Sequence, residues 1–154
     1  MSTATASIRT TVTDPQLRNG IMPRAQLSEA ACKIALRKTD HFSIRQFAGW
    51  ELMEATTVIK VLQDLGTPAP AIGPDASALL AKLEAMPTTE FNRAFMEAEL
   101  SNHEVLRDLA KEYLAGFDDF EQTNENETRH VAMLAHFAFT EHVGLCKNIL
   151  EEVQ

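Results

Sequence analysis

The apolar residues of this chain recur with the period of an α-helix from about residue 24 to the end. In one segment, for example, Ile44, Phe47, Ala48, Leu52 and Ala55 recur at intervals of one to four residues. That spacing places side chains on one face of a helix, whereas a half-buried strand needs alternation at every second residue. No segment of the sequence alternates in that way over a useful length, so we expect an all-α protein.

Breaks in the apolar pattern divide the chain into segments. Gly66 is a good helix C-cap, and the prolines of TPAPAIGPD exclude a helix directly after it. Asn124, followed three residues later by Glu127, resembles a capping box for the last helix. Four long amphipathic helices and one longer crossover that carries a short extra helix describe a four-helix bundle. The approximate helix ranges are 24–38, 42–65, 75–86, 90–115 and 124–151.

Residues 1–23 differ in composition from the rest of the chain. They are rich in Ser and Thr, have little apolar periodicity and close with Gly20 and Pro23. We therefore interpret residues 1–23 as an N-terminal arm, flexible or docked on a partner, and residues 24–154 as one helical bundle domain. A chain of 154 residues, 45% of them hydrophobic, has the size of a single domain with one core.

The charge of the chain narrows the possible functions. It has 14 basic and 22 acidic residues and a net charge of −8, without a basic run. This balance disfavours binding to nucleic acid or to an anionic membrane. No apolar stretch is long enough to span a bilayer and no leader pattern is present, so we expect a cytoplasmic protein. Cys32 and Cys146 fit no paired metal or redox spacing and are expected to be small buried hydrophobic residues.

Polar residues interrupt the apolar faces of three predicted helices. His142 lies near the middle of the apolar arc of the last helix, and Glu51 lies within that of the second. On the third long helix Asn102 lies near the centre of the inner face, Glu99 toward one side and His103 at the margin; Glu99 and His103 are one turn apart, so both side chains can reach the same point. Glu54 lies at the edge of its apolar face. The pattern predicts that these side chains meet in the interior.

Buried polar groups of this kind need partners, because an unpaired carboxylate or imidazole is costly inside a protein. Carboxylate and imidazole groups suit one divalent ion such as zinc, iron or manganese. A hydrogen-bond network that includes Asn102, with no metal, would satisfy the same groups. The candidate metal ligands are Glu51, Glu54, Glu99, His103 and His142.

Three segments bear further on the fold, namely KIALRKTDHFSIRQFAGWELMEA, FNRAFMEAELSNHEVLRDLAKEYL and HFAFTEHVGLCKNIL. They resemble the bacterial ferritin-like bundles known as domain of unknown function 4142, and the similarity covers nearly everything after Leu27. The Phe-Asp-Arg-Ala-Tyr run of that family corresponds here to residues 91–95. Its mid-helix Asp-His pair corresponds to Asn102 and His103, and its last-helix histidine to His142. The resemblance implies a ferritin-like four-helix bundle.

Some positions depart from the family pattern. The Asp-His pair of its second helix corresponds to Glu54 and the alanine after it, and the acidic residue of its first helix corresponds to Ser28. The wider ferritin-like di-metal class uses Glu-x-x-His motifs, whereas this chain has Glu51-x-x-Glu54 and Glu99-x-x-Asn102. We therefore expect one divalent ion, or no metal at all, rather than a di-metal centre.

Two functions follow from these observations. The first is a ferritin-like bundle that binds a divalent metal between its helices and acts in a stress response. If such a protein were an enzyme, we would expect a metal-dependent oxidoreductase. The second is a non-catalytic structural or regulatory interaction module without metal, a homo-oligomer formed through the arm or through exposed aromatic residues. Candidates for such aromatic residues are Trp50, Phe117 and Phe120. A third hypothesis is a small molecule in the bundle core, walled by Phe47, Phe95, Phe137 and Phe139.

Overall fold

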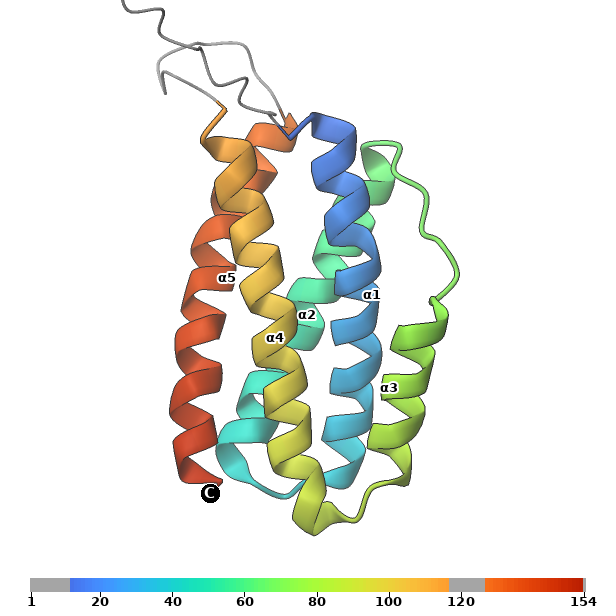
Figure 1. Ribbon diagram of the computed structural model, residues 1–154, viewed down its shortest axis with the longest axis vertical. Coiled ribbons are helices and arrows are strands. Elements are labelled where there is room, and N and C mark those ends of the chain that lie inside the picture. The colour runs from blue at the N-terminus through green and yellow to red at the C-terminus, as the bar shows by residue number, and fades with distance from the viewer. Residues whose placement is uncertain (1–11, 117–126, 154) are drawn as a thin grey trace, which may run out of the picture.

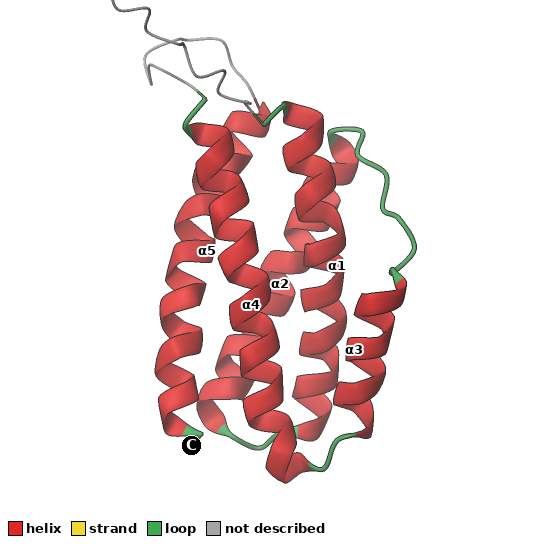
Figure 2. Cartoon of the chain, in the orientation of Figure 1, coloured by secondary structure: helices red, strands yellow, loops and turns green. Residues whose placement is uncertain are grey.

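A computed structural model of the chain describes residues 12–116 and 127–153. Over these residues the chain forms α-helices joined by loops, without a strand, as Figure 2 shows. The prediction of an all-α protein is confirmed. The helices of the described part are α1 Asp14–Lys38, α2 Phe42–Asp64, α3 Pro74–Ala85, α4 Thr88–Leu114 and α5 Glu127–Glu152.

The four long helices lie side by side along one axis, and the short helix α3 packs on the outside against α1 and α4 (Figure 1). The colour gradient shows that α1 and α5 run in one direction and that α2 and α4 run in the other. Helix α1 packs mainly against α2 and α4, and α5 packs mainly against α4, whereas α2 and α5 touch little. The long crossover from α2 to α4 contains α3, as the sequence predicts.

Helix α1 begins at Asp14, well before the predicted start at about residue 24. The predicted start is wrong because the helix continues through both Gly20 and Pro23. A capping box starts it: the Thr13 hydroxyl accepts a hydrogen bond from the Gln16 backbone N–H, and the Gln16 side chain accepts one of 2.8 Å from the Thr13 N–H. The capping box thereby gives partners to two backbone N–H groups at the helix start, those of Thr13 and Gln16.

Residues 14–23 therefore belong to the bundle and not to an arm. Leu17, Ile21 and Met22 are fully buried, and the Tyr113 hydroxyl on α4 donates a 2.6 Å hydrogen bond to the Asp14 carboxylate. Interior Gly and Pro cost a helix about 1 and about 3 kcal/mol relative to Ala. Burial of three large apolar side chains, each contributing about 1.5 to 3 kcal/mol, offsets that cost.

The other helix boundaries lie close to their predicted positions. Helix α3 is the clearest difference, since its N-cap is Gly73 and Asp75 lies in its first turn. The cap predicted at Asn124 and the aromatic residues Phe117 and Phe120 lie outside the described residues. The same holds for residues 1–11, the first part of the predicted arm.

Two apolar clusters fill the bundle, and we call them the lower and the upper cluster after their places in Figure 1. Both cysteines are buried and free in the lower cluster, in agreement with the prediction. The lower cluster includes Cys32, Ile34, Ile44, Phe47, Phe91, Phe95, Cys146 and Ile149. The upper cluster includes Leu17, Ile21, Met22, Leu62, Leu106, Tyr113 and Phe139.

Candidate metal centre

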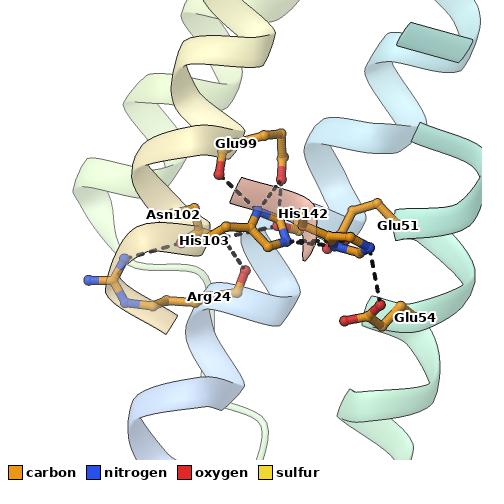
Figure 3. Close-up of polar contacts among 8 residues, drawn as sticks. Arg24, Glu51, Glu54, Glu99, Asn102, His103 and His142 are labelled. Carbon is orange, nitrogen blue, oxygen red and sulfur yellow. Dashed lines mark hydrogen bonds and ion pairs between the residues drawn. The ribbon is translucent and has the colours of Figure 1, made fainter. Parts of the chain in front are cut away.

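Four of the predicted site residues lie together in the interior of the bundle (Figure 3). Glu51 comes from α2, Glu99 and His103 come from α4, and His142 comes from α5. All four are buried, and His103 has no exposed surface. Helical periodicity therefore predicted correctly that Glu51 and His142 point inward, whereas His103, expected at the margin of its face, is fully buried.

The group forms a polar layer between the two apolar clusters. The ring of Phe47, from the lower cluster, stands edge-on to His142 with 5.5 Å between ring centroids. From the upper cluster, the ring of Phe139 stands edge-on to His103 at 5.8 Å. Aromatic rings thus cover the layer from both sides, and its charges interact in a medium of low dielectric constant.

Three donor atoms within this layer face one another. Oε2 of Glu51 lies 2.9 Å from Nδ1 of His142 and 3.1 Å from Nε2 of His103. The two ring nitrogens are 3.3 Å apart. Ligands held about 2.1 Å from an ion are separated by about 3.0 Å at right angles and by about 3.4 Å at the tetrahedral angle. The three atoms therefore have the spacing of one face of a coordination shell, with two histidines and one carboxylate.

A hydrogen bond within α4 determines which nitrogen of His103 faces the site. Nδ1 of His103 lies 2.8 Å from the backbone carbonyl oxygen of Glu99. A carbonyl can only accept, so Nδ1 carries the hydrogen. In the neutral ring Nε2 then directs its lone pair toward the other two donor atoms. Histidines that bind metals commonly donate their second N–H to a carbonyl or a carboxylate in this way.

His142 has an outer partner of the same kind. Its Nε2 lies 3.5 Å from Oε2 of Glu54, while its Nδ1 faces the other donor atoms. Glu54 is three residues after Glu51 on α2, and about a quarter of its side chain is exposed. Glu54 therefore lies behind the imidazole and not among the three facing atoms.

The carboxylate of Glu99 also lies outside the facing group. Its Oε2 accepts a 2.9 Å hydrogen bond from the hydroxyl of Ser28 on α1 and lies 3.5 Å from Nδ1 of His103, the outer nitrogen. The structure thus arranges the five predicted residues as three facing donors and two outer carboxylates.

Asn102, one turn of α4 beyond Glu99, makes hydrogen bonds to two residues of α1, Ser28 and Arg24. The amide of Asn102 donates hydrogen bonds to the Ser28 hydroxyl at 3.0 Å and to the Arg24 carbonyl at 3.1 Å, and its oxygen accepts one of 3.1 Å from the Arg24 guanidinium (Figure 3). Asn102 was predicted to be inside. Arg24 was missed, because an arginine at the predicted start of a helix carries no signal of inward contact.

Burial and charge shift the pKa values within the layer. Burial would raise the pKa of Glu51, but hydrogen bonds from His103 and His142 outweigh it and lower that pKa to about 2. Burial would lower the pKa of His103, but the hydrogen bond and the charge of Glu51 raise it to about 9. Burial raises the pKa of Glu99 to about 7. At neutral pH, without an ion, His103 and Glu51 therefore form an imidazolium–carboxylate pair.

Comparisons with known protein families, with curated proteins and with solved structures gave no match to this chain. The resemblance to domain of unknown function 4142 therefore receives no support from them. Among the helices of the described residues, none is both long and apolar enough to cross a membrane. The assignment of a function rests on the geometry of the polar layer.

Proposed function

We propose that this protein binds one divalent transition-metal ion through Glu51, His103 and His142. Zinc, iron and manganese are the candidate ions, because imidazole and carboxylate ligands suit all three. The observation that carries this proposal is the separation of the three facing donor atoms, which is 2.9 to 3.3 Å in every pair. Three residues from three different helices meet at this spacing in the interior of the bundle.

The outer contacts of the two imidazoles support a single ion. Glu54 lies against the outer nitrogen of His142, and Glu99 offers its carbonyl and its carboxylate to the outer nitrogen of His103. Partners in these positions orient the rings and make the inner nitrogens better ligands. They are on the wrong side of the rings to hold a second ion beside the first.

The arrangement of the helices supports a ferritin-like bundle as part of the same proposal. One long crossover joins α2 to α4, and those two helices run in the same direction. Bundles with one long crossover include the ferritin-like folds, in which metals bind to side chains that project inward from facing helices. The polar layer has this location.

A second candidate function is an interaction module that binds no metal. In its favour, Glu51 and His103 already form a charged hydrogen bond, and the aromatic side chain of Trp50 is half exposed. The contact of 3.3 Å between Nδ1 of His142 and Nε2 of His103 also fits a hydrogen bond between the rings, in which one nitrogen donates and the other accepts. Metal content therefore decides between the two functions.

Metal content tests the proposal directly. The protein would be purified without an affinity tag and analysed by elemental mass spectrometry, before and after anaerobic incubation with ferrous, manganous or zinc salt. We expect close to one ion per chain after incubation with at least one of the three. A His142→Ala variant should lose that ion, whereas His130→Ala, a change at an exposed histidine of the same helix, should retain it.

Circular dichroism on each variant would show whether the helices remain. Wild-type protein that takes up none of the three ions would leave the interaction module as the better assignment. Uptake that is equal in wild type and in a folded His142→Ala variant would place the ion elsewhere in the molecule.

A further inference from the structure

An apolar groove runs between α2 and α5, where the two helices touch little. Its volume is about 490 Å³, which lies within the range of roughly 300 to 1,000 Å³ typical of small-molecule sites. Val58 and Val61 line it from α2, and Val131 and Leu134 line it from α5. The groove is thus large enough for a small ligand and is walled mainly by aliphatic side chains.

Large apolar side chains at the rim of this groove are open to solvent. Met53 on α2 is 64% exposed, and Leu134 and Phe137 on α5 are 73% and 70% exposed. Phe137 was expected in the wall of a cavity in the bundle core, and its exposure shows that this prediction is wrong. Neighbouring exposed apolar residues beside a groove are typical of a binding surface.

The groove has one charged lining residue, Glu54. One carboxylate oxygen of Glu54 lies 3.5 Å from Nε2 of His142, and Figure 3 shows the other oxygen pointing away from that ring. Among the described residues, no hydrogen bond reaches this second oxygen, Oε1. The groove therefore combines an apolar wall with one acidic hydrogen-bond acceptor that has capacity left.

We propose that this groove binds an amphipathic small molecule with an aliphatic body and a primary amine head group. The aliphatic body would lie against Val58, Val61 and Leu134, and the ammonium would donate a charge-assisted hydrogen bond to Oε1 of Glu54. Charge complementarity selects the amine, because a carboxylate head group would meet Glu54 and a protein with a net charge of −8. The groove shares Glu54 with the metal proposal, where Glu54 is the outer partner of His142, but none of the groove contacts requires an ion.

Three ligands with the same aliphatic chain test the groove: octylamine, octanoate and octanol. Each would be titrated into chelator-treated protein while the fluorescence of Trp50 is followed. Trp50 is the only tryptophan of the chain and lies about one turn before Met53 and Glu54 on α2. We expect saturable binding of one octylamine per chain, with a dissociation constant at least about tenfold below that of octanoate. Isothermal titration calorimetry would confirm the stoichiometry.

Two variants and one control separate the contributions. Glu54→Gln should abolish the preference for octylamine over octanoate while octanol still binds. Leu134→Ser should weaken the binding of all three ligands. Phe42→Ser, which changes an exposed apolar residue of α2 that does not line the groove, should leave binding unchanged.

Three results would overturn the assignment. Octylamine and octanoate that bind equally well, or a preference that survives in Glu54→Gln, would rule out recognition of the head group. No saturable binding of any of the three would rule out a small-molecule site. Sedimentation of the wild type as a dimer that Leu134→Ser converts to a monomer would show that a second copy of the chain occupies the groove instead.

Discussion

Nδ1 of His103 lies 2.8 Å from the backbone carbonyl oxygen of Glu99, one turn earlier on the same helix. Because this carbonyl is part of the backbone of α4, no side-chain substitution on a neighbouring helix removes it. The hydrogen bond fixes the hydrogen on the outer nitrogen and leaves the inner nitrogen for Glu51, His142 or an ion. The predictions about the site begin from this relationship.

Removal of His103 alone should destabilise the protein strongly. A His103→Leu substitution leaves Glu51 buried with one fewer partner, and broken buried ion pairs cost roughly 3 to 5 kcal/mol. Urea denaturation of chelator-treated protein measures the free energy of unfolding.

The triple variant Glu51→Met, His103→Leu, His142→Leu is the matched comparison. Replacing a buried ionic group by apolar residues of similar volume is often neutral or stabilising. We expect its free energy of unfolding to lie within about 1 kcal/mol of the wild type or above it. A triple variant as unstable as His103→Leu would show that the layer is kept for stability and not for a ligand.

The stability of the metal-free protein should fall as the pH rises from about 5 to 9. Glu99, with a folded pKa of about 7 against its usual 4.5, binds its proton more tightly when folded, so stability is lost between those values. His103, raised from 6.5 to about 9, adds a loss between 6.5 and 9. Glu51 acts in the opposite direction, because its lowered pKa contributes stability above about 4.5 that is lost toward pH 2.

Denaturation curves of chelator-treated protein at pH 5, 7 and 9 measure this profile. In the triple variant the loss between pH 7 and 9 should be much smaller, because His103 is absent. A wild-type protein that is most stable at pH 9 would contradict the assignment of these protonation states.

The affinity for the metal ion should rise with pH, whereas the stability of the metal-free protein should fall. An ion must displace the proton from Nε2 of His103, whose pKa is about 9. Below that value the affinity should rise by about tenfold for each pH unit. Competition with a chelator of known affinity between pH 6.5 and 8.5 measures the slope. An affinity that does not depend on pH, after correction for the chelator, would mean that His103 is not a ligand.

Glu54 should affect the strength of metal binding and not its stoichiometry. Glu54→Gln keeps the size of the side chain but weakens the acceptor for Nε2 of His142, and such outer partners are typically worth 10-fold to 100-fold in affinity. Ser28→Ala provides the contrast, because it removes a hydrogen bond to the Glu99 carboxylate but leaves the Glu99 carbonyl in place. We expect Ser28→Ala to lose about 1 kcal/mol of stability with nearly unchanged affinity. The same chelator competition distinguishes the two variants.

The capping box at the start of α1 should contribute measurably to the stability of that helix. Thr13→Ala removes the hydroxyl that accepts from the Gln16 N–H, which should cost about 1 kcal/mol. Hydrogen exchange should become faster in the first turn of α1 before it changes in α4. Unchanged exchange at that turn would show that burial of Leu17 and Ile21 alone holds the helix start.

Most of the fold was predictable because four amphipathic helices have a period that is visible in the sequence. The start of α1 was not predictable from apolar spacing, because Gly20 and Pro23 are unfavourable inside a helix and tertiary contacts, such as the burial of Leu17 and Ile21, offset their cost. The capping signal of Thr13 and Gln16 was present in the sequence and indicates the correct start.

The candidate site was predictable at the level of helix faces but not of atoms. A rotation of about 100° per residue identifies Glu51 and His142 as inward and puts His103 at the margin of its face. It does not show whether Glu54 and Glu99 stand in front of or behind the imidazoles, because that depends on rotamers and on contacts with other helices. Leu134 illustrates a further limit: it is an apolar residue of α5 that stays exposed at the side where α2 and α5 touch little.

The polar layer between the lower and upper clusters also restricts how the helices can slide along one another. A shift of α4 by one turn, about 5.4 Å, would carry Glu99 or His103 among the apolar side chains of one cluster. Glu99 would then lose its hydrogen bond to α1, or His103 its contacts with α2 and α5. The displaced group would remain buried without partners, at a high cost in free energy. Apolar side chains alone would tolerate several axial alignments of these helices, whereas the layer permits one.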